Sequence, residues 1–128
     1  MRILLDTCTF LWLILDTEDL TERVRDLFVD PDNEVFLSVV SAWEIAVKYA
    51  IGRLDLPGEP RLYIPEQRER HRVQSLSLDE QSSLQVSALP KIHNDPFDRM
   101  LISQAMMHGL TILSPDELIQ KYPVRIIW

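Results

Sequence analysis

The sequence predicts an α/β domain whose strands form a mostly parallel sheet. Short apolar runs of strand length alternate along the chain with segments whose apolar residues recur at helical spacing. Strands that alternate with helices pair in parallel, because each helix carries the chain back across the sheet. The chain has 128 residues, of which 46% are hydrophobic and 26% charged, as in one ordinary soluble domain. We therefore expect a single domain over residues 1–128.

The expected elements follow one another in a regular order. Strands are expected at residues 2–5, 34–37, 73–76, 110–113 and 124–128. Helices are expected at residues 7–15, 20–29, 61–71 and 96–108, from Ser38 or Ser41 to about Gly52, from a Ser77–Glu80 capping box to a point before Pro90, and from Ser114 to Tyr122. No internal repeat or low-complexity tract interrupts this order.

The charge balance and the single cysteine limit the classes of function. The 13 basic and 20 acidic side chains give a formal net charge of −7. This is evidence against nucleic-acid binding through overall basicity, but not against a nuclease whose bound cations reverse the local field. Cys8 alone can form neither an internal disulfide nor a structural zinc site. The apolar segment Cys8–Leu15 is too short to span a membrane and no cleavage site follows it, so we expect a reducing, cytoplasmic location.

Residues 93–102, His-Asn-Asp-Pro-Phe-Asp-Arg-Met-Leu-Ile, contain a clear helix start. Asp95 is expected as the N-cap and Pro96 as the first helical residue, where its missing N–H costs nothing. Asp98 is then the third helical residue. Side chains three positions apart share one side of a helix, so Asp98 can point out from the edge of the core beside Asp95.

Four acids from separate segments are expected at one edge of the sheet. In open parallel sheets, ligands bind beyond the carboxyl ends of the strands. Asp6 and Asp116 each follow an expected strand. Glu44 lies in the helix after the second strand, and Asp98 opens a helix whose start faces the same edge. Such a cluster needs a compensating cation, and oxygen ligands without histidine or thiolate favour Mg²⁺ or Mn²⁺, which act on phosphodiesters.

Each acid also has a structural explanation of its own. Asp6 and Asp98 stand near helix starts, where carboxylates act as caps or interact with the helix dipole. Glu44 precedes Lys48 by four residues, which is the spacing of an ordinary helix ion pair. Asp116 lies in a Ser-Pro-Asp-Glu capping box. The joint placement of the four, rather than any one of them, favours a metal site.

The four motifs, in this order, resemble those of PIN-domain ribonucleases. They are Ile-Leu-Leu-Asp-Thr ending at Thr7, Ser-Ala-Trp-Glu-Ile-Ala around Glu44, Asp-Pro-Phe-Asp-Arg-Met at residues 95–100, and Leu-Thr-Ile-Leu-Ser-Pro-Asp ending at Asp116. Within that family the chain resembles the VapC-like toxins of type II toxin–antitoxin pairs, in the subgroup with the Asp-Pro-Phe-Asp-Arg signature. The resemblance extends over residues 2–128.

The resemblance implies a PIN-like three-layer α/β/α sandwich and Mg²⁺- or Mn²⁺-dependent endonucleolytic cleavage of RNA. The catalytic and metal-binding acids that it implies are Asp6, Glu44, Asp98 and Asp116. The supporting residues that it implies are Thr7, Ser114 and Asp95. A substrate phosphate would complete the coordination of one or two ions.

The resemblance also implies partners. Relatives act as homodimers that a small cognate antitoxin neutralises. For the antitoxin we expect an exposed apolar strip among Phe10, Leu11, Trp12 and the second helix. Arg99 and Lys48 are expected as phosphate contacts. The three histidines are scattered without ligand spacing, so no base role is expected for them.

Two other functions compete with the nuclease. One is a catalytically silent PIN-like binding module, although all four acids are present. The other is an aspartyl-phosphate phosphotransfer domain. That class needs a second acid beside the first strand's aspartate or two residues after it, and here Thr7 and Cys8 follow Asp6.

Overall fold

The computed structural model describes residues 1–128, and its strands form one five-stranded sheet. The strands are β1 (Arg2–Leu5), β2 (Glu34–Ser38), β3 (Gln74–Leu76), β4 (Thr111–Leu113) and β5 (Ile126–Ile127). Every pairing is parallel, in the order β3-β2-β1-β4-β5. β1 is thus the central strand: β2 and β3 extend the sheet on one side of it, and β4 and β5 extend it on the other. The prediction of a mostly parallel sheet is confirmed.

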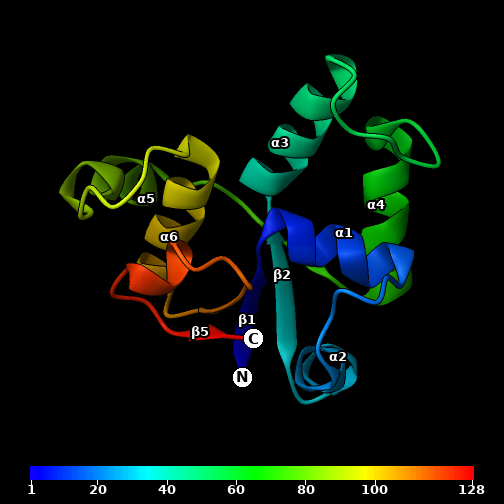
Figure 1. Ribbon diagram of the computed structural model, residues 1–128, viewed down its shortest axis with the longest axis horizontal. Helices are drawn as coiled ribbons and strands as arrows, with labels where there is room; N and C mark the ends of the chain where they lie inside the picture. Colours follow the sequence, from blue (N-terminus) through cyan, green and yellow to red (C-terminus); the bar gives the residue numbers. More distant parts are fainter.

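Helices cover both faces of the sheet. They are α1 (Thr7–Leu15), α2 (Glu22–Val29), α3 (Val39–Ala50), α4 (Pro60–His71), α5 (Glu80–Gln85) and α6 (Pro96–His108). Figure 1 shows α1 to α4 on one side of the sheet and α5 and α6 on the other. This is the expected three-layer α/β/α arrangement. None of the helices combines the length and apolar character needed to cross a membrane.

The core has two halves because the side chains of the central strand alternate in direction. Ile3 and Leu5 of β1 belong to a buried cluster that includes Phe10 of α1. Leu4 points to the opposite face, into a cluster that includes Leu101 and Ile102 of α6. A strand covered on both faces has no polar side, which explains the uninterrupted Ile-Leu-Leu run.

Local side-chain caps fix the helix boundaries near the carboxyl ends of the strands. Asp6 caps α1 by accepting a hydrogen bond from the Thr9 backbone N–H at 2.8 Å. Ser38 caps α3 in the same way. The expected α6 is confirmed at both ends: Asp95 is the N-cap before Pro96, and Gly109, with φ of 65°, is the left-handed C-cap.

Three expectations about local structure are wrong. No α-helix spans residues 114–122, where the chain forms only a 3₁₀ turn at Ile119–Lys121. The Ser114 hydroxyl oxygen accepts from the Asp116 N–H, and an Asp116 carboxylate oxygen accepts from the Leu118 N–H, so short side-chain turns replace the helix. The helix expected from a Ser77 capping box instead begins after Asp79, which accepts from the Ser82 N–H. The last strand covers only residues 126–127.

The prediction of an exposed apolar strip that includes Phe10 of α1 is also wrong for that residue. Phe10 is completely buried in the core beneath α1. Leu11 and Trp12 are half-buried, and the Trp12 ring packs against Trp128 with ring centroids 5.9 Å apart. The aromatic side chains of α1 therefore pack into the core or against Trp128.

Candidate metal site at the sheet edge

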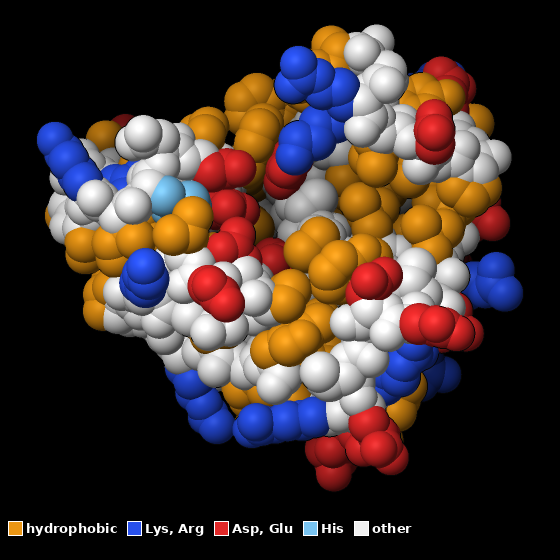
Figure 2. All heavy atoms as spheres, viewed as in Figure 1, with side chains coloured by type: hydrophobic (Ala, Val, Ile, Leu, Met, Phe, Trp, Pro, Cys, Tyr) orange, Lys and Arg blue, Asp and Glu red, His pale blue; other side chains and the backbone are white.

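The expected acids stand around the point where the sheet order changes direction. Asp6 directly follows β1 and Ser114 directly follows β4, and these two strands are neighbours. The Asp6 N–H donates to the Leu113 carbonyl at 3.4 Å, which ties the two strand ends together. In doubly wound sheets, the crevice between such strands is where ligands bind. Figure 2 shows acidic side chains (red) gathered beside a hollow in the middle of this face, with lysine or arginine side chains (blue) at its upper rim.

Asp6 is a buried carboxylate with no ion-pair partner in the protein. It is 4% exposed, and its Oδ1 accepts from the Thr9 N–H at 2.8 Å and from the Cys8 thiol at 3.4 Å. Burial raises the pKa of Asp6, and hydrogen bonds from Ser114 and Thr9 oppose the shift. A buried anion left without a countercharge is costly, and a cation at this point would relieve that cost.

Glu44 is held by side chains from two helices. Its Oε1 accepts from the Thr7 hydroxyl at 2.6 Å, and its Oε2 is paired with Lys48 one turn further along α3. Thr7 also lies 3.0 Å from the Ser41 hydroxyl. Hydrogen bonding and charge attraction from Glu44 raise the pKa of Lys48, and the charges of Asp95 and Asp98 add to the shift. Lys48 is therefore the cation that faces this acidic cluster.

Asp98 lies in the first turn of α6, near three other acids. Burial raises the pKa of Asp98 to about 6; a hydrogen bond from His93 opposes the shift, and the like charges of Asp95, Asp116 and Asp6 add to it. Repulsion of this kind requires that these acids lie close enough to interact. The structure therefore brings Asp98 near both strand-end acids.

Asp95 and Asp116 also make local hydrogen bonds. Asp95 Oδ1 accepts from the Phe97 and Asp98 backbone N–H groups at 2.9 and 3.0 Å. The capping of α6 is therefore enough to explain an aspartate at position 95. Asp116 uses Oδ1 for the Leu118 N–H at 2.8 Å and makes no other side-chain hydrogen bond within the chain. Asp116 thus keeps an oxygen available for a ligand.

The donor set fits a hard divalent cation, although the side chains do not form a closed cage. No three His, Cys, Asp or Glu side chains stand in an arrangement that would ligate one ion as they are placed. Lys48 occupies one oxygen of Glu44, and His93 contacts one oxygen of Asp98. Carboxylate oxygens on separate segments, one of them buried and unpaired, are the ligands that Mg²⁺ and Mn²⁺ prefer.

Cys8 is beside this cluster but is not a nucleophile. Burial and the nearby negative charge of Asp6 raise the pKa of the Cys8 thiol to about 12. A thiol with such a pKa remains protonated at neutral pH and donates its proton to the Asp6 carboxylate.

Arg99 has contacts that differ from its expected phosphate role. Its guanidinium donates to the backbone carbonyls of Pro90 at 2.7 Å and Val86 at 3.3 Å, and to the Tyr122 hydroxyl at 2.9 Å. These bonds give Arg99 a structural role that holds the loop before α6. A phosphate contact by Arg99 stays a prediction without support from these contacts.

Three residues that lie at the site were not expected there from the sequence. His93 lies with Nε2 3.2 Å from Asp98 Oδ2, and Tyr122 contacts His93 from the loop after β4. Ser41 contacts Thr7, and its position one turn before Glu44 on the same helix was a usable signal. Tyr122 had no such signal, because the sequence separates it from His93 by 29 residues.

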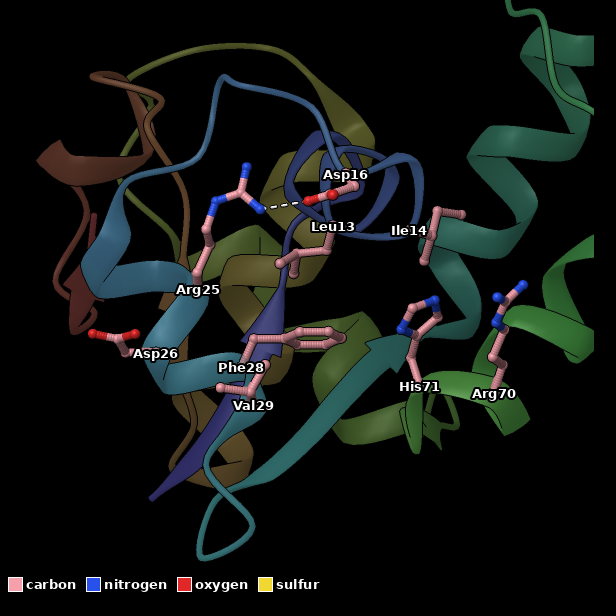
Figure 3. A pocket seen from close by; sticks show the side chains of 9 residues that line it. All are labelled: Leu13, Ile14, Asp16, Arg25, Asp26, Phe28, Val29, Arg70 and His71. Carbon is pink, nitrogen blue, oxygen red and sulfur yellow. Dashed lines mark hydrogen bonds and ion pairs between the residues drawn. The ribbon is translucent and has the colours of Figure 1, made fainter.

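A separate pocket of about 510 Å³ lies between α1, α2 and α4. Figure 3 shows Leu13 and Phe28 among the side chains that line it, with Asp16 paired with Arg25 at 2.5 Å. None of the expected site residues lines this pocket. The acidic cluster is therefore identified by its chemistry and its place on the sheet, not by the size of a cavity.

The raised pKa of Asp98 predicts how the stability of the metal-free protein depends on pH. A carboxyl group whose folded pKa is raised stabilises the fold below its unfolded pKa near 3.8, and that contribution is lost as the pH rises through about 6. We expect the free energy of unfolding to fall by about 1–2 kcal/mol over this range, after allowing for solvent screening of a partly exposed group. Urea unfolding at a series of pH values measures the fall.

Asp98→Asn is the control for this titration. Asn does not ionise, so the variant should show a smaller fall between pH about 4.5 and about 6.5, while Asp6, whose pKa burial also raises, keeps its own contribution. Carboxylates with a lowered pKa, such as Asp79 beside His108, change their protonation, and so the stability, below this pH range. Equal slopes in the variant and the parent chain would contradict the assignment to Asp98.

Comparisons with known proteins agree with this architecture. Residues 3–124 match the family model described as "PIN domain". The chain is 36% identical over 61 residues to Ribonuclease VapC16 of Mycobacterium tuberculosis; the match covers 48% of this chain and 43% of that relative. The chain thus spans less than half the length of this relative.

Solved structures share the fold at low sequence identity. VapBC2 from Rickettsia felis, bound to a DNA fragment from their promoter, matches with a TM-score of 0.75 and 12% identity, over 100% of this chain and 99% of that one. DNA-bound VapBC from Salmonella typhimurium matches with a TM-score of 0.71 and 20% identity, over 99% of this chain and 97% of that one. The family match over nearly the whole chain decides the classification: this chain belongs to the PIN domain family.

Proposed function

We propose that this chain is a divalent-metal-dependent endoribonuclease, a hydrolase of RNA phosphodiester bonds, and the toxin of a toxin–antitoxin pair in the Asp-Pro-Phe-Asp-Arg subgroup. The observation that carries the proposal is that Asp6 directly follows β1 at the switch point of the sheet and that the charges of Asp6 and Asp116 both act on Asp98, while Thr7 holds Glu44. Membership of the PIN domain family and the similarity to Ribonuclease VapC16 support it. A cytoplasmic location belongs to the same proposal.

Each residue of the site has a separate role in the proposed reaction. Asp6, Asp98 and Asp116 would hold the cation once their side chains turn toward it, and Glu44, which Thr7 orients, would join them once the cation replaces Lys48 at its Oε2. The chemistry that Mg²⁺ or Mn²⁺ supplies at such a site is activation of a water and neutralisation of charge on the phosphate. The ammonium group of Lys48, once released from Glu44, would be free to contact an RNA phosphate.

The supporting residues act through these acids. Ser114 lowers the pKa of Asp6 by hydrogen bonding and so favours its ionised, ligating form. Asp95 fixes the start of α6 and thereby the position of Asp98. Neither residue needs to touch the cation for these effects.

Partner binding has support in an exposed apolar strip on α3. Val39, Trp43 and Val47 follow one another at successive turns and are 37%, 63% and 37% exposed. Exposed apolar side chains in a row are typical of a surface that another protein covers. We infer that the cognate antitoxin or the second subunit of a homodimer covers this strip, which lies next to Glu44.

Cleavage of labelled RNA tests the proposed function. The protein is expected to cut single-stranded RNA with Mg²⁺ or Mn²⁺ present and to stop when EDTA removes the ion, because the ion supplies the activation of the water and the neutralisation of phosphate charge. The same protein pre-treated with EDTA and resupplied with Mn²⁺ should regain activity, which separates metal loss from unfolding. If no RNA is cut with any divalent ion, the silent binding module becomes the better reading.

A further inference from the structure

His93 stands between Asp98 and Tyr122 with both ring nitrogens in contact. Its Nε2 lies 3.2 Å from Asp98 Oδ2, and its Nδ1 lies 2.7 Å from the Tyr122 hydroxyl. The His93 side chain is 11% exposed and Tyr122 is 4% exposed, so little water competes for these bonds. A histidine so enclosed has a defined ring orientation.

The neighbours of the Tyr122 hydroxyl decide where its proton goes. Arg99 Nη1 lies 2.9 Å from the oxygen and the His93 backbone nitrogen lies 3.3 Å from it. A guanidinium and a backbone amide can only donate, so together they occupy both lone pairs of the oxygen. The hydroxyl proton is then directed to the remaining neighbour, His93 Nδ1.

The proton position on Tyr122 in turn fixes the tautomer of His93. An Nδ1 that accepts a hydrogen bond carries no proton, so the neutral ring has its proton on Nε2. Nε2 donates this proton to Asp98 Oδ2. With both nitrogens engaged in hydrogen bonds, His93 has no free lone pair to act as a general base.

The chain of hydrogen bonds starts from a fixed point. Arg99 also donates to the Pro90 and Val86 carbonyls, which holds its guanidinium in place. Tyr122 belongs to the loop after β4 that also carries Asp116. The bonds from Arg99 through Tyr122 to His93 therefore link the start of α6, with Asp98, to the loop that carries another acid of the site.

We propose that Arg99, Tyr122 and His93 form a positioning chain that holds Asp98 Oδ2 and leaves Oδ1 directed to a divalent cation. The inference rests on the proposed function, because it assigns a role toward the same cation. His93 and Tyr122 are positioning residues, since they act only through Asp98. Hydrogen-bonded partners of this kind typically change metal affinity about 10–100-fold when removed.

Tyr122→Phe is the main test, because it keeps the buried ring and removes only the hydroxyl. Two readouts that do not depend on RNA cleavage apply. Long-range ¹H–¹⁵N correlation spectra should show the Nε2-protonated tautomer of His93 in the parent chain and a mixture of tautomers in the variant. The dissociation constant for Mn²⁺, measured by electron paramagnetic resonance of the free ion, should rise about 10-fold.

Further variants separate positioning from packing. His93→Ala should weaken Mn²⁺ binding more than His93→Gln, whose amide can still donate to Asp98. Tyr49→Phe is the control for loss of a tyrosine hydroxyl, because Tyr49 is 36% exposed and lies outside the His93–Tyr122–Arg99 contacts, and it should leave the spectra and Mn²⁺ affinity unchanged. If His93→Ala fails to fold, Tyr122→Phe still decides.

The outcomes distinguish the positioning chain from the proposed function. Parent-like Mn²⁺ affinity in Tyr122→Phe, with loss of binding in Asp98→Asn, would overturn the positioning chain and leave the metal site standing. An Nδ1-protonated His93 in the parent chain would also overturn it. If the parent chain binds no Mn²⁺ at all, the proposed function fails and the inference fails with it.

Discussion

Asp6→Asn is expected to lower RNA cleavage by more than about 100-fold, because loss of partners outside the metal's own ligands already costs about 10–100-fold. The substitution removes the charge of a carboxylate that is 4% exposed and without an ion-pair partner. The initial rate of cleavage of a fluorescently labelled RNA with Mn²⁺ measures the loss. Cleavage at the parent rate would contradict the assignment of Asp6 as a metal ligand.

The same variant should keep or increase its stability, which separates lost chemistry from lost folding. An Asn Oδ1 can still accept from the Thr9 N–H, so the cap of α1 is retained. The charge whose burial raises the pKa of Asp6 is gone. Thermal unfolding without metal should give an equal or higher Tm, and Mn²⁺ should raise the Tm of the parent chain but not of the variant. Asp19→Asn, at an exposed position, is the matched control and should behave as the parent.

Phe10→Ala is expected to destabilise the fold by about 3–5 kcal/mol, the usual cost of removing a buried aromatic ring and leaving a cavity. Phe10 has no exposed surface and packs in the cluster that joins α1 to the sheet. Urea unfolding followed by circular dichroism measures the change. Such a loss is a large part of the stability of a domain of this size.

Trp43→Ala is the control for an aromatic truncation at the surface. Trp43 is 63% exposed and touches Phe97 with ring centroids 5.2 Å apart, so its removal leaves no enclosed cavity. The expected loss of stability is below about 1 kcal/mol. A loss in Phe10→Ala no larger than in Trp43→Ala would mean that Phe10 does not anchor α1 to the core.

The parts of the fold that depend on neighbouring residues could be predicted from the sequence. The apolar run of β1 predicts a strand covered on both faces, and Ile3, Leu4 and Leu5 are indeed buried on both sides. Asp95 and Gly109 mark the two ends of α6 because capping needs only residues within a turn of the helix end.

Local rules failed where two of them competed. The Ser-Pro-Asp-Glu sequence after β4 has the composition of a capping box, yet Ser114 and Asp116 close short turns on their own backbone instead. Asp79 rather than Ser77 begins α5, although both residue types can cap. Nearly every residue of the α1 helix that carries Phe10 is apolar, so the sequence alone does not reveal which side of the helix faces inward.

The sequence by itself determined which acids follow strands or lie in the helices next to them, and therefore which four are candidates: Asp6, Glu44, Asp98 and Asp116. Only the tertiary structure decided what each of them touches. Thr7 meets Glu44 across 37 residues of sequence, and Tyr122 meets His93 across 29. The physical reason is that strands and helix caps depend on residues close together in the sequence. These hydrogen bonds, in contrast, form only once the sheet has brought separate segments together.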